Sequence, residues 1–283
     1  MKLKPVIMIM ILAFELLILT GCESGPKEVK LAYKFPTDKK FHYKYDGEIN
    51  STIYENGKLV DSGEKPQKIS YTMETAAITD DGNGRLHYVY STEPSGANEI
   101  APASAVSDSG VWSTDFVMDP RGRIIDIIAG DETSAETIDY YKKLFEQTSP
   151  MYPEEPVSVG YNWNHTVKAV LNTGTTDAST TYKIKALVRE AGYDCAVIEY
   201  KGTMFIPLAD NLSKDPDITA SGHDRIDVEG VVYFAYTLGT IVREEETSHV
   251  VREGILTRGK QEINFKIDEI RNFTSRLVEI ENL

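Results

Sequence analysis

The stretch FHYKYDGEINSTI, residues 41–53, decides the class of fold, because apolar and polar side chains alternate along it. One face of an extended chain would carry Tyr43, Tyr45, Ile49 and Ile53. The opposite face would carry Lys44, Asp46, Glu48 and Asn50. A strand with one buried and one wet face has this period of two, which is typical of antiparallel sheets. The stretch therefore predicts a mainly β protein.

The same alternation recurs later in the chain. In residues 181–190 the apolar positions are Tyr182, Ile184, Ala186 and Val188. In residues 262–268 they are Ile263, Phe265 and Ile267, and polar residues such as Asn264 and Lys266 lie between them. We expect the apolar set of each stretch to be buried and the polar set to face water.

Short turn signals separate these stretches, and most of them contain glycine. They are Asn56-Gly57, Asp81-Gly82-Asn83-Gly84, Ala191-Gly192, Leu238-Gly239 and Arg258-Gly259. Connections of this kind favour β-hairpins. Successive strands should therefore be neighbours in the sheet.

Only residues 133–148, TSAETIDYYKKLFEQT, have helical spacing, and they predict one amphipathic helix over 134–147. Its apolar stripe would consist of Ile138, Tyr141, Leu144 and Phe145, and Pro150 follows its end. A lone helix between two sheet-rich stretches has to bury this stripe on a sheet. We expect it to bridge the two halves of the chain and to cover the mouth of the curved sheet.

A faint duplication relates the two halves of the chain. Residues 69–91 align with 180–202, and residues 112–127 align with 228–244 in the same order. The alignment predicts two similar sheet modules, residues 31–150 and residues 151–283, that pack together as one domain.

The N-terminus is a targeting segment by its pattern. A short cationic start, Met1 to Lys4, precedes an apolar run from Pro5 to Leu19, which is too short to span a membrane comfortably. The sequence Leu19-Thr20-Gly21-Cys22 that follows closely resembles the lipobox of bacterial lipoprotein signal peptides. The resemblance implies that residues 1–21 are removed and that Cys22 is acylated, and residues 22–30 would then form a polar tether.

A second resemblance concerns the rest of the chain. A lipobox, a polar tether and two modules of long strands joined by one helix look like repeated-sheet lipoproteins of bacterial envelopes. More distantly, the pattern is similar to the outer-membrane lipoprotein carrier superfamily. These resemblances imply a large curved antiparallel sheet, or unclosed β-barrel, and a lipid or other apolar ligand in its concavity.

Charge and cysteine content exclude other classes of function. The formal net charge is −14, which disfavours nucleic acid as a partner. Once Cys22 is acylated, only Cys195 remains, so no intrachain disulfide can form. Cys195 lies in an apolar run, where we expect it to fill the core rather than to react.

No motif for catalysis, metal binding or a cofactor is present. The histidines His42, His87, His165, His223 and His249 lack metal-ligand spacing. The acidic stretches 80–84 and 210–217 lack the spacing of a calcium loop, so we interpret them as turns or solvated loops. Glu244, Glu245 and Glu246 follow an apolar strand, and we interpret them as a solvated hairpin end. We therefore expect no enzyme activity, no metal and no cofactor.

Tyrosine is abundant, and several tyrosines fall on apolar strand faces: Tyr43, Tyr45, Tyr71, Tyr182 and Tyr233. This placement favours core packing over platforms for sugar stacking. Two functions stay open. One is a non-enzymatic binding module for a lipid or apolar ligand. The other is a structural lipoprotein that meets an envelope protein or glycan through its outer surface. Either would be exported and anchored to the outer membrane of a Gram-negative cell or the outer face of a Gram-positive cytoplasmic membrane.

Overall fold

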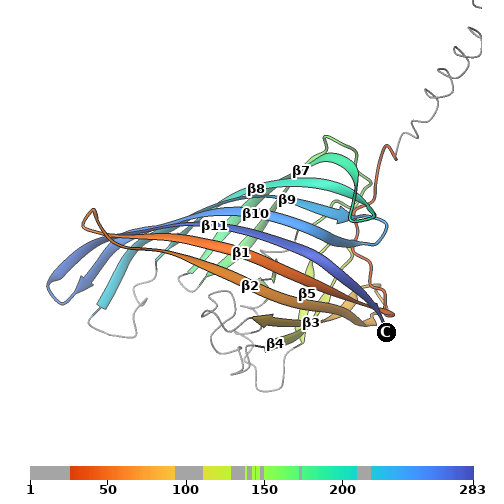
Figure 1. The fold of residues 1–283 in the computed structure, drawn as a ribbon, viewed down its shortest axis with the longest axis horizontal. Coiled ribbons are helices and arrows are strands. Elements are labelled where there is room, and N and C mark those ends of the chain that lie inside the picture. The colour runs from red at the N-terminus through yellow and green to blue at the C-terminus, as the bar shows by residue number, and fades with distance from the viewer. Residues whose placement is uncertain are drawn as a thin grey trace, which may run out of the picture.

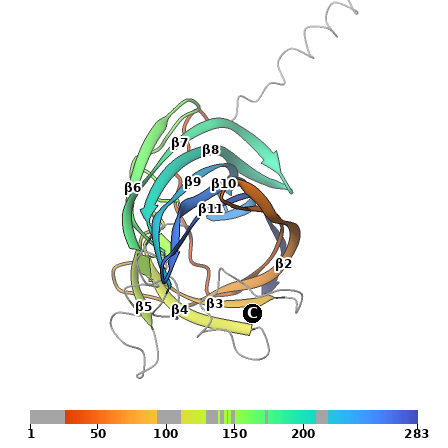
Figure 2. The ribbon, with the colours of Figure 1, turned by 90° about the vertical axis from the view of Figure 1, so that its left-hand side faces the viewer.

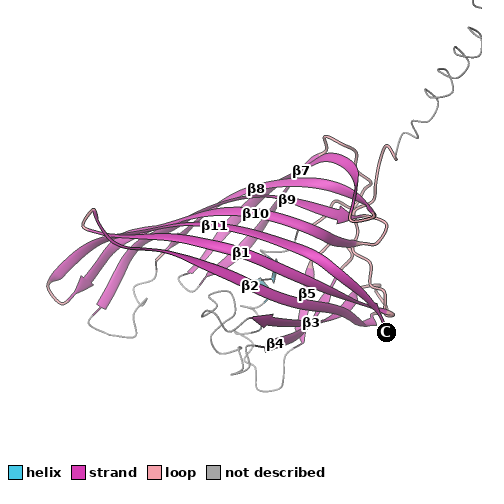
Figure 3. Ribbon diagram, in the orientation of Figure 1, coloured by secondary structure: helices cyan, strands magenta, loops and turns pink. Residues whose placement is uncertain are grey.

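The computed structural model describes residues 26–92, 111–128, 138, 142–143, 145–146, 150–171, 174–208 and 218–283. In this part of the chain, eleven antiparallel strands form one sheet (Figures 1 and 3). The strands are β1 (Lys39–Glu55), β2 (Lys58–Ile78), β3 (Gly84–Thr92), β4 (Val111–Met118), β5 (Ile124–Ile128), β6 (Asn162–Leu171), β7 (Gly174–Glu190), β8 (Tyr193–Pro207), β9 (Ile218–Ala235), β10 (Thr240–Arg258) and β11 (Gln261–Asn282).

The strand order is β5-β4-β3-β2-β1-β11-β10-β9-β8-β7-β6, so nearly every strand pairs with its neighbour in sequence. The exception is the pairing of β1 with β11, which joins the first half of the chain to the second. The aligned segments of the two halves form equivalent hairpins, β2–β3 with β7–β8 and β4–β5 with β9–β10. The duplication itself stays a prediction.

The expected hairpin turns are all present in the described residues. Asn56 and Gly57 have φ values of 48° and 76°, and Ala191 and Gly192 have values of 50° and 87°. Two positive φ angles in a two-residue loop are those of a type I′ turn, whose twist matches the strands it joins. The turn signals thus predicted the neighbouring strands correctly.

The sheet curls around an interior but does not close, because β5 and β6 are its two free edges (Figure 2). This confirms the predicted fold class of a large curved antiparallel sheet, or unclosed barrel. Side chains alternate between a concave inner face and an outer face along each strand. At Tyr182 and Ile184 on β7, for example, the inner side chains are only 7 % and 0 % exposed.

Two loop segments fill one end of the curled sheet, and we call them the plug: residues 26–36 and 150–157. Val29 pairs with Val157 in an isolated antiparallel bridge. Leu31 and Tyr152 are fully buried against inner side chains of β7, β8 and β9. Val29, near the C-terminal end of the predicted tether, thus belongs to the core.

Hydrogen bonds attach the plug to the strand turns at this end. The backbone N–H groups of Tyr33 and Tyr152 donate to the carbonyls of Pro120 and Arg121 at 2.7 and 2.8 Å. The N–H of Lys34 donates to the carbonyl of Gly239 at 3.1 Å. These bonds satisfy the backbone of an irregular segment that would otherwise be costly to bury.

The predicted helix over 134–147 lies mostly outside the described residues. Those that are described, including Ile138 and Phe145, have helical backbone. Both side chains pack against a cluster on β3, β4 and β5 that includes Leu86, Phe116 and Ile124. Tyr141 and Leu144, the rest of the predicted stripe, lie outside the described residues, so a lid over the mouth stays a prediction.

The alternation in residues 262–268 is present, but its apolar side is less buried than we expected. Ile263, Phe265 and Ile267 are half-buried, and Lys266 is half-buried as well. These residues lie near the β10–β11 turn, at the end of the sheet opposite the plug (Figure 1). The expectation of full burial was wrong, because the plug covers only the other end.

Candidate functional site

A single row of side chains crosses the inner face from β6 to β2, and we call it the belt. The strand register places one residue of each strand directly opposite the next. In order from β6 to β2, these residues are Trp163, Tyr182, Tyr200, Gly230, Glu246, Phe273, Gly47 and Gln67. The belt lies between the plug and the distal half of the curled sheet. It combines stacked rings with a carboxylate and an amide. The ring centroids of Trp163 and Tyr182, for example, are 5.1 Å apart.

Two glycines give the belt its shape. A Cβ at Gly230 would lie 2.5 Å from the Tyr200 phenol, so only glycine lets this ring extend across β9 toward β10. A Cβ at Gly47 would overlap the ring of Phe273, which lies flat over β1. Glycine inside a strand often marks such a close approach.

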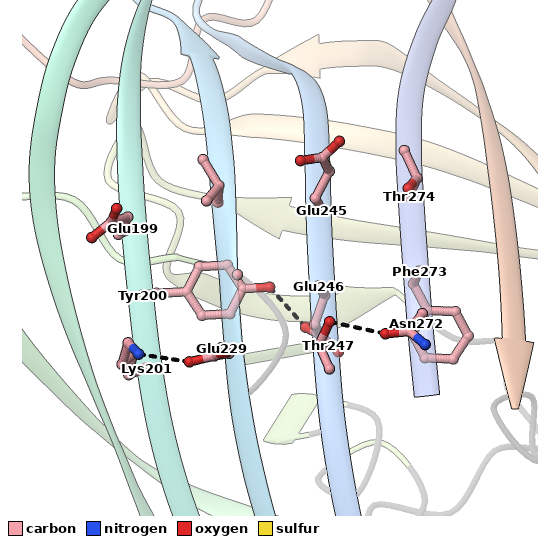
Figure 4. Close-up of a pocket in the computed structure, with 12 residues that line it drawn as sticks. Glu199, Tyr200, Lys201, Glu229, Glu245, Glu246, Thr247, Asn272, Phe273 and Thr274 are labelled. Carbon is pink, nitrogen blue, oxygen red and sulfur yellow. Dashed lines mark hydrogen bonds and ion pairs between the residues drawn. The ribbon is translucent and has the colours of Figure 1, made fainter. Parts of the chain in front are cut away.

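Tyr200 contacts two carboxylates on β10, and Figure 4 shows the contact with Glu246. Its hydroxyl oxygen lies 2.8 Å from Oε2 of Glu246 and 3.1 Å from Oε1 of Glu244. Both glutamates belong to the inner face, because they alternate with the outward Glu245. Burial, and then the charge of Glu246, raise the pKa of Glu244 to about 7. Burial also raises the pKa of Glu246, although the Tyr200 hydrogen bond and the charge of Arg271 oppose the shift.

More tyrosines surround the carboxylate pair on the inner face. The rings of Tyr43 and Tyr71 are stacked with centroids 4.7 Å apart, and Tyr88 stacks on Tyr71 at 5.1 Å. Tyr45 stacks on Phe273 at 4.9 Å. Burial, and then the charges of Glu246 and Glu244, raise the pKa of the Tyr45 phenol, so this hydroxyl stays protonated.

Two buried polar atoms, one in the belt and one near it, have no hydrogen-bond partner among the described residues. They are Oε1 of Gln67 and the hydroxyl oxygen of Tyr90. Their residues are only 5 % and 8 % exposed, and both stand on inner positions of the sheet. A buried polar group without a partner costs about 1–3 kcal/mol. Such groups are candidates for contacts with a ligand.

Two arginines on the inner face are paired with acids. Arg252 donates to both carboxylate oxygens of Asp224, at 2.7 and 2.9 Å, and Asp224 is 1 % exposed. Arg271 pairs with Glu269 on its own strand. Each of these cations therefore already has an acidic partner.

Beyond the belt lies a surface that we call the distal trough. Seven apolar side chains from five strands occupy its inner positions and are only half-buried: Ile53, Met204, Ile226, Leu256, Ile263, Phe265 and Ile267. Inner apolar residues near the plug, such as Ile198 and Phe234, are 1 % and 0 % exposed. The concavity is thus filled at one end and lined by accessible apolar groups at the other.

The outer face is mostly polar, although it also exposes apolar side chains such as Phe205, Ile255 and Ile270. A shallow groove of about 500 Å³ runs over β8 to β11 (Figure 4). Most of its lining belongs to the outer face and includes Glu199, Lys201, Glu229, Thr247 and Asn272. Lys201 pairs with Glu229 at 2.6 Å, and Thr247 donates to the Asn272 side-chain oxygen at 3.0 Å.

The structure settles several expectations about single residues. Cys195 is fully buried, which confirms a core role, and burial raises the pKa of its thiol to about 11. Residues 79–83 form the β2–β3 turn, as expected of the acidic stretch at 80–84. Tyr233 is half-buried: it packs against the cluster that contains Cys195, and the Arg243 guanidinium lies over its ring, 5.0 Å from the centroid. Cys22 and residues 210–217 lie outside the described residues.

The interpretation of Glu244, Glu245 and Glu246 as a hairpin end was wrong. β10 continues through them to Arg258, so two of the three side chains point into the interior. Alternation from Val250 back along β10 would have placed Glu244 and Glu246 on its apolar face. The run of three acids concealed this signal, because it looks solvated in sequence.

Comparisons with known proteins identify no family. Neither the protein-family models nor the curated proteins contain a match to this chain. Among solved structures, one titled for lipid–protein interactions in lipovitellin is similar over 88 % of this chain, with 12 % identity and a TM-score of 0.41. This chain spans only 26 % of that one.

A second solved structure is the hypothetical lipoprotein YmcC from Escherichia coli (K12). It is similar over 80 % of this chain and 85 % of its own, with 9 % identity and a TM-score of 0.23. Likenesses this distant add nothing to the description of the fold. In the described residues, no helix combines the length and the hydrophobicity needed to cross a bilayer.

Proposed function

We propose that this protein is a membrane-anchored lipoprotein of a bacterial envelope whose curled sheet binds a lipid or other apolar ligand without catalysing a reaction. The distal trough carries this proposal. Its seven half-buried apolar side chains face the concavity, whereas equivalent positions near the plug are fully buried. An apolar chain lying in the trough would remove their remaining surface from water, which stabilises by roughly 25 cal/mol per Å².

The anchor is the acylated Cys22 that the Leu19-Thr20-Gly21-Cys22 motif implies. Two or more acyl chains hold a protein firmly on a membrane, whereas one binds only marginally. Residues 26–36 enter the fold at the plugged end (Figure 1), so the tether would attach there. The trough would then lie at the end of the sheet that is farther from the anchor. The protein would be exported and would sit on the outer membrane or on the outer face of the cytoplasmic membrane.

A binding role fits the inner carboxyl pair better than hydrolysis does. Paired carboxyls can serve as general acid and base when a reacting bond lies between them. Here the Tyr200 hydroxyl lies within hydrogen-bond distance of both Glu244 and Glu246 and occupies that position.

Binding of the apolar fluorescent probe N-phenyl-1-naphthylamine to the purified full chain tests this function. Phe265→Asp places a charge in the trough, and we expect it to reduce probe binding at least about tenfold. Phe205→Asp is the matched control, because Phe205 is 52 % exposed on the outer face, and it should leave binding unchanged. Circular dichroism would verify that both variants fold. Absence of probe binding to the unmodified chain, or equal binding by both variants, would contradict the proposal.

The outer groove supports a second candidate function, recognition of an envelope protein or glycan. Its hydroxyl, amide and carboxylate groups, including Thr247, Asn272 and Glu229, are of the kind that bind sugar hydroxyls. Lys201→Ala with Thr247→Ala should then abolish binding of soluble peptidoglycan fragments and leave probe binding intact.

A further inference from the structure

We infer that the belt binds the head group of the ligand and selects an amphiphile with an ammonium head. This inference rests on the proposed function and names the chemistry of its ligand. Glu244 and Glu246 are the inner carboxyls that carry it. In the described part of the chain, neither of them has a lysine or arginine within ion-pair distance, because Arg252 and Arg271 pair with Asp224 and Glu269, although the charge of Arg271 still acts on Glu246.

The hydrogen bonds of Tyr200 leave the carboxyl pair short of donors. The hydroxyl has one hydrogen, but its oxygen lies within 2.8 and 3.1 Å of two carboxylate oxygens. When the hydrogen points to Glu246, Glu244 needs a proton or another donor. An ammonium group supplies both a positive charge and donors, or, if quaternary, the charge alone.

A buried acceptor and aromatic rings also lie on this inner face. Among the described residues, Gln67 Oε1 is a buried acceptor without a partner, and the Tyr90 hydroxyl, which can accept or donate, has none either. The stacked rings of Tyr45 and Phe273 stand beside Glu246 in the same concavity. Aromatic faces attract cations, by about 2 kcal/mol when water is excluded. Carboxylates, free acceptors and aromatic rings together favour a cation over an anion.

The position of the belt places the polar head at one end of the trough. From Glu246 to Leu256, β10 runs ten residues along the concavity, which corresponds to about 33 Å. An extended acyl chain fits within this length. The head would then lie at the belt, toward the plug, and the chain would lie over the trough residues.

An amphiphile with an anionic head is the disfavoured alternative. The whole chain carries a formal charge of −14, and among the described residues the inner acids Glu244, Glu246, Glu269 and Asp224 outnumber the inner cations Lys65, Arg252 and Arg271. Carboxylates that face an anion in a low-dielectric interior repel it more strongly than they would in water.

Isothermal titration with three detergents of equal chain length tests the inference, each used below its critical micelle concentration. The heads are trimethylammonium, sulfate and maltoside on a tetradecyl chain. We expect the trimethylammonium form to bind at least about tenfold more tightly than the sulfate form, with the maltoside in between. Tetramethylammonium, which has no chain, should bind far more weakly than its tetradecyl counterpart.

Substitution locates the preference at the belt. Glu244→Gln with Glu246→Gln should abolish the preference for trimethylammonium over sulfate. Glu245→Gln is the matched control, because Glu245 lies between the two on the same strand and faces outward. If the double variant does not fold, the ranking of the three heads by the unmodified chain still tests the head-group preference itself.

The outcomes separate the two proposals. Equal binding of all three detergents would overturn the head-group inference and support the proposed function. Binding of none would contradict both. Tight binding of tetramethylammonium alone would assign the belt to small soluble cations instead of an amphiphile.

Discussion

Tyr200 on β8 reaches across β9 to Glu246 on β10, with 2.8 Å between the phenol oxygen and the carboxylate. A side chain that bridges over a whole strand needs an empty position in between. Gly230 provides it, and the result is a hydrogen bond between strands that do not pair with each other. The belt therefore depends on the glycine at position 230 as much as on the side chains that it contains.

The first prediction concerns this empty position. Gly230→Ala should destabilise the fold by roughly 1–3 kcal/mol, because the new Cβ would lie 2.5 Å from both the Tyr200 phenol and the Glu245 carbonyl oxygen. Gly63→Ala on β2 is the control, since a Cβ there meets nothing within 4 Å, and it should change stability by about 0.5 kcal/mol or less. Chemical denaturation measures both. Equal effects would show that Tyr200 does not occupy the space over Gly230.

The second prediction concerns pH. The pKa of Glu244 rises from 4.5 to about 7 on folding, so the native state holds this proton more tightly than the unfolded chain does. Ionisation of Glu244 therefore destabilises the fold progressively between pH 4.5 and 7, and fully above pH 7. Glu244→Gln should raise the free energy of unfolding at about pH 8 by roughly 1–3 kcal/mol and have little effect at about pH 4.

Glu245→Gln serves as the control for this pH dependence. Glu245 faces outward and pairs with Arg243, so its replacement should not stabilise the protein at about pH 8. If Glu244→Gln had the same effect on the free energy of unfolding at both pH values, Glu244 would be an ordinary solvated carboxylate.

The third prediction compares three phenylalanines. Phe234 is fully buried at the plug, and Phe234→Ala should cost roughly 3–5 kcal/mol. Phe265 is half-buried in the trough, so Phe265→Ala should cost about 1–2 kcal/mol. Phe205 is 52 % exposed on the outer face, and Phe205→Ala should cost about 0.5 kcal/mol or less. A full core penalty at Phe265 would mean that the trough is packed internally.

The fourth prediction concerns the anchor. Cys22→Ser should leave the domain folded but unacylated and unprocessed, because the thiol that the lipobox motif presents for acylation would be missing. Metabolic labelling with a radioactive fatty acid measures this, and the unmodified chain should be labelled. Label that still enters the Cys22→Ser variant would disprove Cys22 as the attachment point.

Much of the fold could be predicted from sequence because it depends on local signals. Alternation at residues 41–53 and turn pairs such as Asn56-Gly57 act within a strand or a hairpin. Long-range packing could not be predicted in this way. Nothing local to Val29 or Tyr152 indicates that they fill one end of the sheet, and their absence from the other end explains why Phe265 is only half-buried.

The candidate site was missed for a related reason. The acids of β10 were judged by composition, as a solvated run, although alternation from the neighbouring apolar positions places Glu244 and Glu246 inside. Their partner Tyr200 lies 44 and 46 residues away in sequence. Only the pairing of β8, β9 and β10 brings these groups together.

Native mass spectrometry of the full chain extracted from bacterial membranes tests the central claim most directly. We expect a species whose mass exceeds that of the acylated polypeptide by one amphiphile, and we expect Phe265→Asp to lose that extra mass while Phe205→Asp keeps it. A spectrum that contains only the acylated polypeptide, under conditions that retain lipid on a known lipid-binding protein, would contradict a ligand in the concavity.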